Sequence, residues 1–137
     1  MKTFLLSLLS ILLLTACYAD TKNDPTDNWL HDYDAALEIA KKQDKNIYLF
    51  VGADKCPFCK KFKTKTLSKN NVIEKLQEDY ILLYLSRDQH FIPEEFERVG
   101  VPKHYFLTKN GKVIFNSYGL LEPDGFFLLL DEAELNQ

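Results

Sequence analysis

Two cysteines three positions apart are the residues of this chain whose spacing most directly implies chemistry. Cys56 and Cys59 enclose Pro57 and Phe58 in the stretch DKCPFCKKF. A pair with this spacing can bind a metal ion, form a structural disulfide, or cycle between dithiol and disulfide by exchanging electrons with other proteins. The rest of the sequence favours these three uses unequally.

A metal site finds little support among the residues that would have to complete it. Structural zinc sites need four ligands, commonly two cysteine pairs or one pair with two histidines. The three histidines, His31, His90 and His104, are far apart and show no ligand spacing. We therefore expect no structural metal site, although a copper or zinc ion held loosely by the two thiolates alone stays open.

A purely structural disulfide is also weakly supported. A bridge between Cys56 and Cys59 would close a loop with two intervening residues, and short loops gain the least stability from cross-linking. The chain is 46% hydrophobic, with ten Phe and seven Tyr, so it can bury a core without such a staple. Redox cycling is therefore the use that the sequence favours.

The charge around the pair supports a reactive thiolate. Six lysines and no acidic residue occur between Lys55 and Lys69, whereas the whole chain carries a net charge of −3. Most of these lysines are expected to form a solvated surface and add little. Lys55 and Lys60 flank the pair and are our candidates for lowering the pKa of a cysteine thiol. The modest net charge gives no reason to expect a nucleic-acid partner.

The pair falls where a buried strand is expected to pass into a helix. The run IYLFV, at 47–51, suits a strand covered on both faces, and Pro57 suits the first turn of a helix. Backbone N–H groups and the helix dipole at this point favour negative charge. We therefore predict that Cys56 is the attacking thiolate and that Cys59 resolves the mixed disulfide.

Hydrophobic periodicity places the remaining elements in the order α-β-α-β-α-β-β-α. Apolar residues from Trp29 to Ala40 recur on one helical face, and KNGK at 109–112 is a strong hairpin signal. The other predicted elements are a helix from 57, a helical piece near 72–76, a strand at 80–85, a helix at 93–100, strands at 104–108 and 112–118, and a final helix at 122–135. This pattern predicts an α/β fold with a central mixed sheet flanked by helices on both faces.

The strand, C-x-x-C and helix together resemble the thioredoxin superfamily, from about 29 to 134. The segment FERVGVPKHYFLTKNGKVIFNSYG, at 96–119, resembles the family's cis-proline loop and the hairpin that follows it. The segment ALEIAKKQDKNIYLFV, at 36–51, resembles a secreted subgroup of thioredoxin-like proteins. That subgroup includes the C-terminal domain of the transmembrane thiol–disulfide interchange protein.

The resemblance implies a thioredoxin fold and a thiol–disulfide oxidoreductase. No cofactor is expected, because the cysteine pair itself carries two electrons. A cis bond between Val101 and Pro102 would lie beside the pair, and these two residues, with Pro57 and Phe58, would contact substrate. The implied partners are the thiols or disulfides of substrate and electron-donor proteins. The subgroup favours a reductase or electron relay, while a disulfide oxidase or isomerase and a redox-inactive binding module remain the alternatives.

Several positions depart from the family's pattern. Lys55 stands where many members have tryptophan, and Lys103 stands where threonine often follows the proline. Phe50 stands where many members have a buried aspartate that manages the proton of the second cysteine. We expect Asp54 or a water molecule to take over this proton transfer. These changes bear on the reduction potential and on the direction of electron flow more than on the fold.

The beginning of the chain predicts export. Lys2 precedes an apolar run of eleven residues, which is too short for a comfortable membrane span. The stretch LTAC resembles the bacterial lipoprotein signal, in which the chain is cut before a cysteine that then carries the lipid; cleavage after Ala19 is the alternative. The predicted segments are a signal peptide at 1–16, a lipidated Cys17 with a polar tether at 17–28, and a thioredoxin-like domain at 29–137. We therefore expect a protein of the periplasm or cell exterior, anchored to a bacterial membrane by its lipid.

Overall fold

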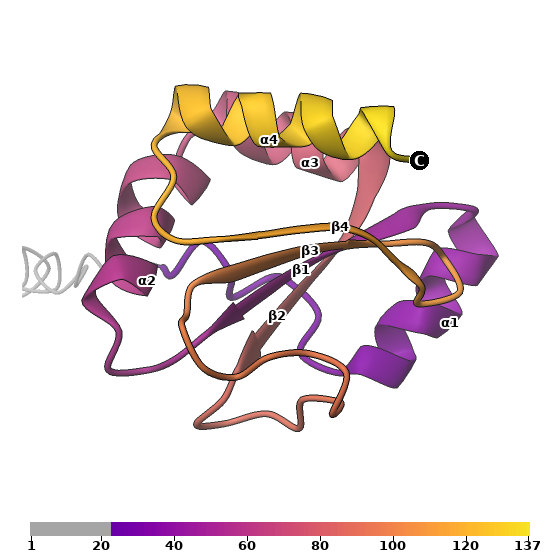
Figure 1. The fold of residues 1–137 in the computed structure, drawn as a ribbon, viewed down its shortest axis with the longest axis horizontal. Helices are drawn as coiled ribbons and strands as arrows, with labels where there is room; N and C mark the ends of the chain where they lie inside the picture. Colours follow the sequence, from indigo (N-terminus) through magenta and orange to yellow (C-terminus); the bar gives the residue numbers. More distant parts are fainter. Residues whose placement is uncertain (1–22) are drawn as a thin grey trace, which may run out of the picture.

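The computed structural model describes residues 23–137. The predicted signal peptide and the predicted lipidation site, Cys17, lie outside these residues. In the part described, a four-stranded sheet carries helices on both of its faces, as the sequence predicts (Figure 1). None of the helices in this part is long and apolar enough to cross a membrane.

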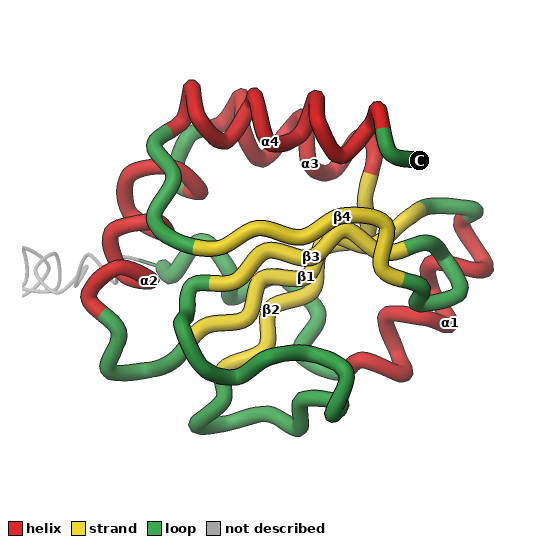
Figure 2. The backbone as a smooth tube through the Cα atoms, viewed as in Figure 1, coloured by secondary structure: helices red, strands yellow, loops and turns green. Residues whose placement is uncertain are grey.

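The sheet is mixed, with the strand order β2-β1-β3-β4 (Figure 2). Its strands are β1 (Asn46–Gly52), β2 (Tyr80–Ser86), β3 (Lys103–Leu107) and β4 (Val113–Tyr118). β1 pairs parallel with β2 and antiparallel with β3, and β3 pairs antiparallel with β4. The predicted hairpin is therefore confirmed, and it turns through Gly111, whose positive φ of 86° suits glycine.

Two apolar cores fix the central strand. The helices are α1 (Tyr33–Gln43), α2 (Pro57–Phe62), the π-helical η1 (Lys63–Leu67), α3 (Asn70–Asp79) and α4 (Pro123–Leu135). Tyr48 and Phe50 of β1 pack on the side of α2, α3 and α4, whereas Ile47, Leu49 and Val51 pack on the side of α1. Because this strand is buried on both faces, its C-terminal end is a rigid base for the cysteine pair that follows.

The leading helix begins later than the sequence pattern suggests. α1 starts after Asp32, whose carboxylate accepts a hydrogen bond from the N–H of Ala35 at 2.8 Å. Trp29 lies in the turn before the helix and is buried, and Leu30 forms a parallel bridge with Leu83. This stretch therefore pairs with the outer edge of β2 instead of lengthening α1.

The chain is a loop where the sequence predicts a helix over 93–100. Side chains supply the hydrogen bonds that a helix would otherwise make. The Arg98 guanidinium donates to the carbonyl of Ile92 at 2.7 Å, and the N–H of Glu97 donates to the Tyr105 hydroxyl at 3.0 Å. The helical prediction was wrong because these contacts, with residues six and eight positions away in the chain, satisfy backbone groups without a helix.

Candidate active site

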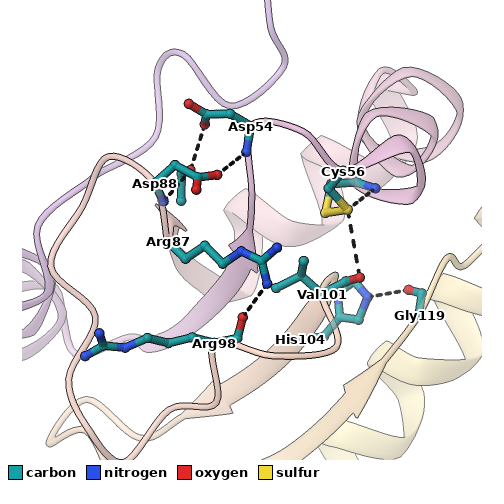
Figure 3. Close-up of a disulfide and its surroundings, with 10 residues drawn as sticks. Asp54, Cys56, Arg87, Asp88, Arg98, Val101, His104 and Gly119 are labelled. Carbon is teal, nitrogen blue, oxygen red and sulfur yellow. Dashed lines mark hydrogen bonds between the residues drawn. A yellow bond between two sulfur atoms is a disulfide. The ribbon is translucent and has the colours of Figure 1, made fainter.

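The cysteine pair lies at the junction of β1 and α2 and forms a disulfide, with Cα atoms 5.2 Å apart (Figure 3). Cys56 is the N-cap residue of α2, and its Sγ accepts a hydrogen bond from the N–H of Cys59 at 3.1 Å. Cys56 is 9% exposed and Cys59 is 2% exposed. Cys56 is therefore the sulfur that an incoming partner can reach first.

The loop that contains Val101 and Pro102 faces the same sulfur. The carbonyl oxygen of Val101 lies 3.8 Å from Sγ of Cys56, and the peptide bond between Val101 and Pro102 is cis (Figure 3). Pro102 is buried, and Val101 is partly exposed. The fold thus brings together two segments that lie more than forty positions apart in the chain, as the family resemblance implied.

The remaining residues predicted for the site surround the pair. Pro57 and Phe58 form the first turn of α2. Phe58 is 57% exposed, so its ring is available to a partner. Lys55 and Lys60 are both exposed beside the pair. Their effect on the cysteine thiols stays a prediction.

An aromatic cluster occupies the position of the family's buried acid. Phe50 is fully buried, and its ring lies 5.3 Å from that of Phe62 and 4.9 Å from that of Tyr84, measured between centroids. Aromatic rings therefore fill this part of the core, and Phe50 itself has no group that could accept the proton of Cys59.

Asp54, the substitute that the sequence offered, is occupied by other contacts. It is exposed, and its carboxylate accepts hydrogen bonds from the Gln89 amide at 2.8 and 2.9 Å and from the Ser86 hydroxyl at 2.8 Å. These bonds, that of Gln89 foremost, lower the pKa of the Asp54 carboxyl. A carboxylate held in its ionised form in this way is a weak base.

A pocket of about 480 Å³ opens beside the disulfide. Both cysteines line it, together with polar side chains from several segments: Asp24, Thr26, Asp27, His31, Asp54, Lys60, Lys63, Tyr84, Gln89 and His90. The rings of His31 and His90 stack, with centroids 4.9 Å apart. Within 23–137, no group of three or more His, Cys, Asp or Glu side chains is arranged to hold a metal ion.

An ion pair between Lys63 and Asp24 lines this pocket, and the Asp24 side chain is 40% exposed. Nζ of Lys63 is 2.8 Å from Oδ2 of Asp24 and 3.8 Å from the centre of the Tyr84 ring, and the Lys63 side chain is 12% exposed. Sequence reasoning missed the pair. The spacing of Lys63 four residues after Cys59 was a usable signal, whereas Asp24 lies in the polar segment assigned to a tether. From residue 23 on, that segment packs on the domain and buries Thr26.

The sequence also did not reveal the two buried hydrogen bonds that His104 makes behind the site. His104, on β3, is fully buried; its Nδ1 accepts from the Tyr48 hydroxyl at 2.8 Å, and its Nε2 donates to the Gly119 carbonyl at 3.0 Å. Its ring lies 4.8 Å from that of Phe62, between centroids. Burial lowers the pKa of His104 to about 4, so the ring is neutral at neutral pH.

Comparison with known proteins agrees with this geometry. A family model described as a thioredoxin-like domain matches residues 33–134. A protein of Archaeoglobus fulgidus is 27% identical over 74 residues, which make up 54% of this chain and 58% of that protein. The chain therefore spans less than two thirds of that relative's length.

Solved structures share the fold at low sequence identity. A thioredoxin from Thermus thermophilus has a TM-score of 0.64 at 19% identity, covering 78% of this chain and 87% of its own. The C-terminal domain of DsbD from Neisseria meningitidis, in the oxidised form, has a TM-score of 0.62 at 21% identity. The match covers 77% of this chain and 98% of that domain. A disulphide isomerase from Xylella fastidiosa has a TM-score of 0.59 at 14% identity, and the match covers 88% of this chain and 98% of that protein's chain. At these identities the likeness establishes the fold.

Proposed function

The chain belongs to the thioredoxin-like domain family, and on this basis we propose that it is a thiol–disulfide oxidoreductase that moves two electrons between its own cysteine pair and the cysteines of partner proteins. The observation that carries the proposal is the Cys56–Cys59 disulfide at the start of α2, with Cys56 the more exposed sulfur. In this position the helix N-terminus stabilises a thiolate at Cys56 once the pair is reduced.

The reaction runs in two exchange steps when the protein acts as a reductant. The Cys56 thiolate attacks one sulfur of a partner disulfide, and the other partner sulfur leaves and takes up a proton. Cys59 then loses its proton and attacks Sγ of Cys56, which breaks the mixed disulfide and releases the second partner thiol. The partner has gained two electrons and two protons, and the pair has lost them. A dithiol donor must reduce the pair before the next cycle.

Partner contacts are proposed on both sides of the reactive sulfur. Phe58 offers an exposed ring in the first turn of α2, next to Pro57, and the loop at Val101 and Pro102 offers a backbone carbonyl close to Cys56. A peptide that carries the target disulfide can lie between these two surfaces. The resemblance to the interchange-protein subgroup supports the reducing or relay direction.

We further propose that the protein works outside the cytoplasm, in the periplasm or at the cell exterior. This part rests on the sequence alone, from the apolar run and the LTAC stretch that ends at Cys17. A lipid on Cys17 would anchor the domain to a bacterial membrane, near partners that share it.

Two cysteine variants and the reduction potential of the cysteine pair test the proposed function. The wild type should catalyse the reduction of insulin by dithiothreitol; Cys59→Ala should accumulate a mixed disulfide with insulin through Cys56, and Cys56→Ala should accumulate little. Failure of the wild type to reduce insulin, or equal trapping by both variants, would reject the proposal. A reduction potential near about −270 mV would support the reductant, and one near about −120 mV would support the oxidase alternative.

A further inference from the structure

Cys59 has to lose a proton before it can close the disulfide, and its surroundings oppose this. Its side chain is 2% exposed and belongs to the apolar cluster that includes Phe50 and Phe62. Burial in such surroundings disfavours a thiolate. A nearby positive charge that is itself shielded from solvent would offset this cost.

Lys63 is the positively charged residue that the fold places on the same helix face as Cys59. Its N–H donates to the carbonyl of Cys59, so the two residues stand one turn apart and their side chains leave the same helix face. Both line the pocket beside the disulfide. The Lys63 side chain is 12% exposed, against 56% for Lys65, so solvent screens the charge of Lys63 much less.

Asp24 holds Lys63 in this position. One carboxylate oxygen of Asp24 is 2.8 Å from Nζ of Lys63, and the other accepts from the N–H and hydroxyl of Thr26 at 2.9 and 2.6 Å. The ring of Tyr84 lies 3.8 Å from the same Nζ and supports the ammonium by a cation–π contact. Burial raises the pKa of the Asp24 carboxyl, but the hydrogen bonds from Lys63 and Thr26 outweigh it and lower the pKa overall. Asp24 is therefore a carboxylate, which orients the ammonium.

We propose that Lys63, held in place by Asp24, stabilises the thiolate of Cys59 while it attacks the mixed disulfide at Cys56. The proton of Cys59 leaves to solvent through the pocket, the bond between the two cysteine sulfurs forms, and the bond from Cys56 to the partner sulfur breaks. The electron pair of that bond goes to the partner sulfur. Asp24 is a positioning residue, since it acts through Lys63. This inference rests on the proposed function and names the charge that serves its second step.

Other charged and titratable groups also lie around the pocket. They are Asp27, His31, Asp54, Lys60, Tyr84 and His90, with His104 behind Phe62 in the core. The carboxylates of Asp27 and Asp54 accept hydrogen bonds from neighbouring groups, and Lys60 is exposed to screening solvent. Burial lowers the pKa of both His90 and His104, so neither ring carries a charge at neutral pH that could replace Lys63.

The reaction of the reduced protein with dithiobis(nitrobenzoate) isolates the Cys59 step. In a full-length Cys17→Ser background, Cys56 attacks this aromatic disulfide and releases one coloured thiolate, and Cys59 then releases the second. The pH dependence of the second release reports the ionisation of Cys59. We expect Lys63→Met to move its midpoint up by about 1 pH unit, which slows the second release at pH 7 about tenfold. Lys63→Arg should stay near the wild-type rate, because it keeps the charge.

Lys65→Met is the matched control, since Lys65 is exposed, pairs with Glu122 at 3.3 Å and lies on the same helix. Its second release should be unchanged. An unchanged second release in Lys63→Met would overturn the inference, as would equal slowing in Lys65→Met or an equal shift in the first release. Thermal melting checks that each variant folds. If Lys63→Met does not fold, Asp24→Asn carries the test, and it should slow the second release several-fold while leaving the first unchanged.

The two proposals fail in different ways. The aromatic probe is artificial, so a wild type that does not reduce insulin would reject the proposed function and leave the Lys63 comparison readable. Conversely, full insulin reduction with no Lys63 effect on the second release would reject the inference about Lys63 alone.

Discussion

Acid should destabilise the fold through His104. The ring is fully buried, its Nδ1 accepts from Tyr48 and its Nε2 donates to Gly119. A second proton would put a charge in an apolar core and would face the Tyr48 hydroxyl where that group now donates. Burial accordingly lowers the pKa of His104 from 6.5 to about 4.

The sign and size of the effect follow from this pKa. An unfolded chain protonates His104 below about pH 6.5, whereas the folded protein does so only near pH 4. Between these values the unfolded state binds more protons, so the free energy of unfolding falls as the pH falls; above pH 6.5 the stabilisation is fully present. The pKa difference, 6.5 − 4 = 2.5, at about 1.36 kcal/mol for each pKa unit, gives a loss of about 3 kcal/mol at pH 4.

Urea unfolding of the oxidised protein at pH 7 and pH 4 measures this loss. The comparison variant is Tyr48→Phe/His104→Leu, which removes the titrating ring together with its hydroxyl partner. Carboxyl titrations are common to both proteins, so the wild type should lose about 2–3 kcal/mol more than the variant on acidification. Equal losses, or a His104 ring that titrates near pH 6.5 by NMR, would refute the reasoning. His90→Asn, which removes a less buried ring, should keep most of the wild-type acid response.

Two further predictions concern the hairpin turn and the anchor. Gly111→Ala should lower the free energy of unfolding by about 2 kcal/mol or more, and Gly119→Ala by about 1 kcal/mol. Both glycines have positive φ, but a Cβ at Gly111 would press on Tyr33 and Leu37, whereas nothing lies within 4 Å of a Cβ built at Gly119. If urea unfolding shows the same loss of unfolding free energy for both variants, the packing argument is contradicted. Cys17→Ser should abolish incorporation of labelled fatty acid and the matching lipid mass on the mature amino terminus, and a wild-type chain that begins after Ala19 would contradict lipidation.

The sequence predicted best those features that depend on neighbours in the chain. The apolar run from Ile47 to Val51 became the buried central strand, and the Asn-Gly turn became the hairpin of β3 and β4. The cysteine pair fell at the strand-to-helix junction because Pro57 starts a helix where a buried strand has just ended. These features leave local marks: periodicity, turn residues and caps.

The features that the sequence did not reveal depend on contacts between residues farther apart than one helical turn. Leu30 joins the edge of β2 through Leu83, so the helical periodicity that includes Trp29 was misleading. The loop at 93–100 replaces helical hydrogen bonds with bonds from side chains. The pairing of Asp24 with Lys63 joins residues thirty-nine positions apart, and no local pattern in a polar segment marks such a partner.

The aromatic core bears on the proposed role of Lys63 at Cys59. Phe50 and Tyr84 are partners across β1 and β2, and their rings fill the space beneath the helix that carries the pair. A charged group on those strands would displace this packing, whereas Lys63 reaches the pocket from the helix and meets Asp24 from the amino-terminal segment. Asp24 is seven positions after Cys17, a distance of at most about 25 Å along an extended chain. If Cys17 carries a lipid, the pocket therefore stays close to the membrane surface, and the partners of the cysteine pair have to present their disulfides there.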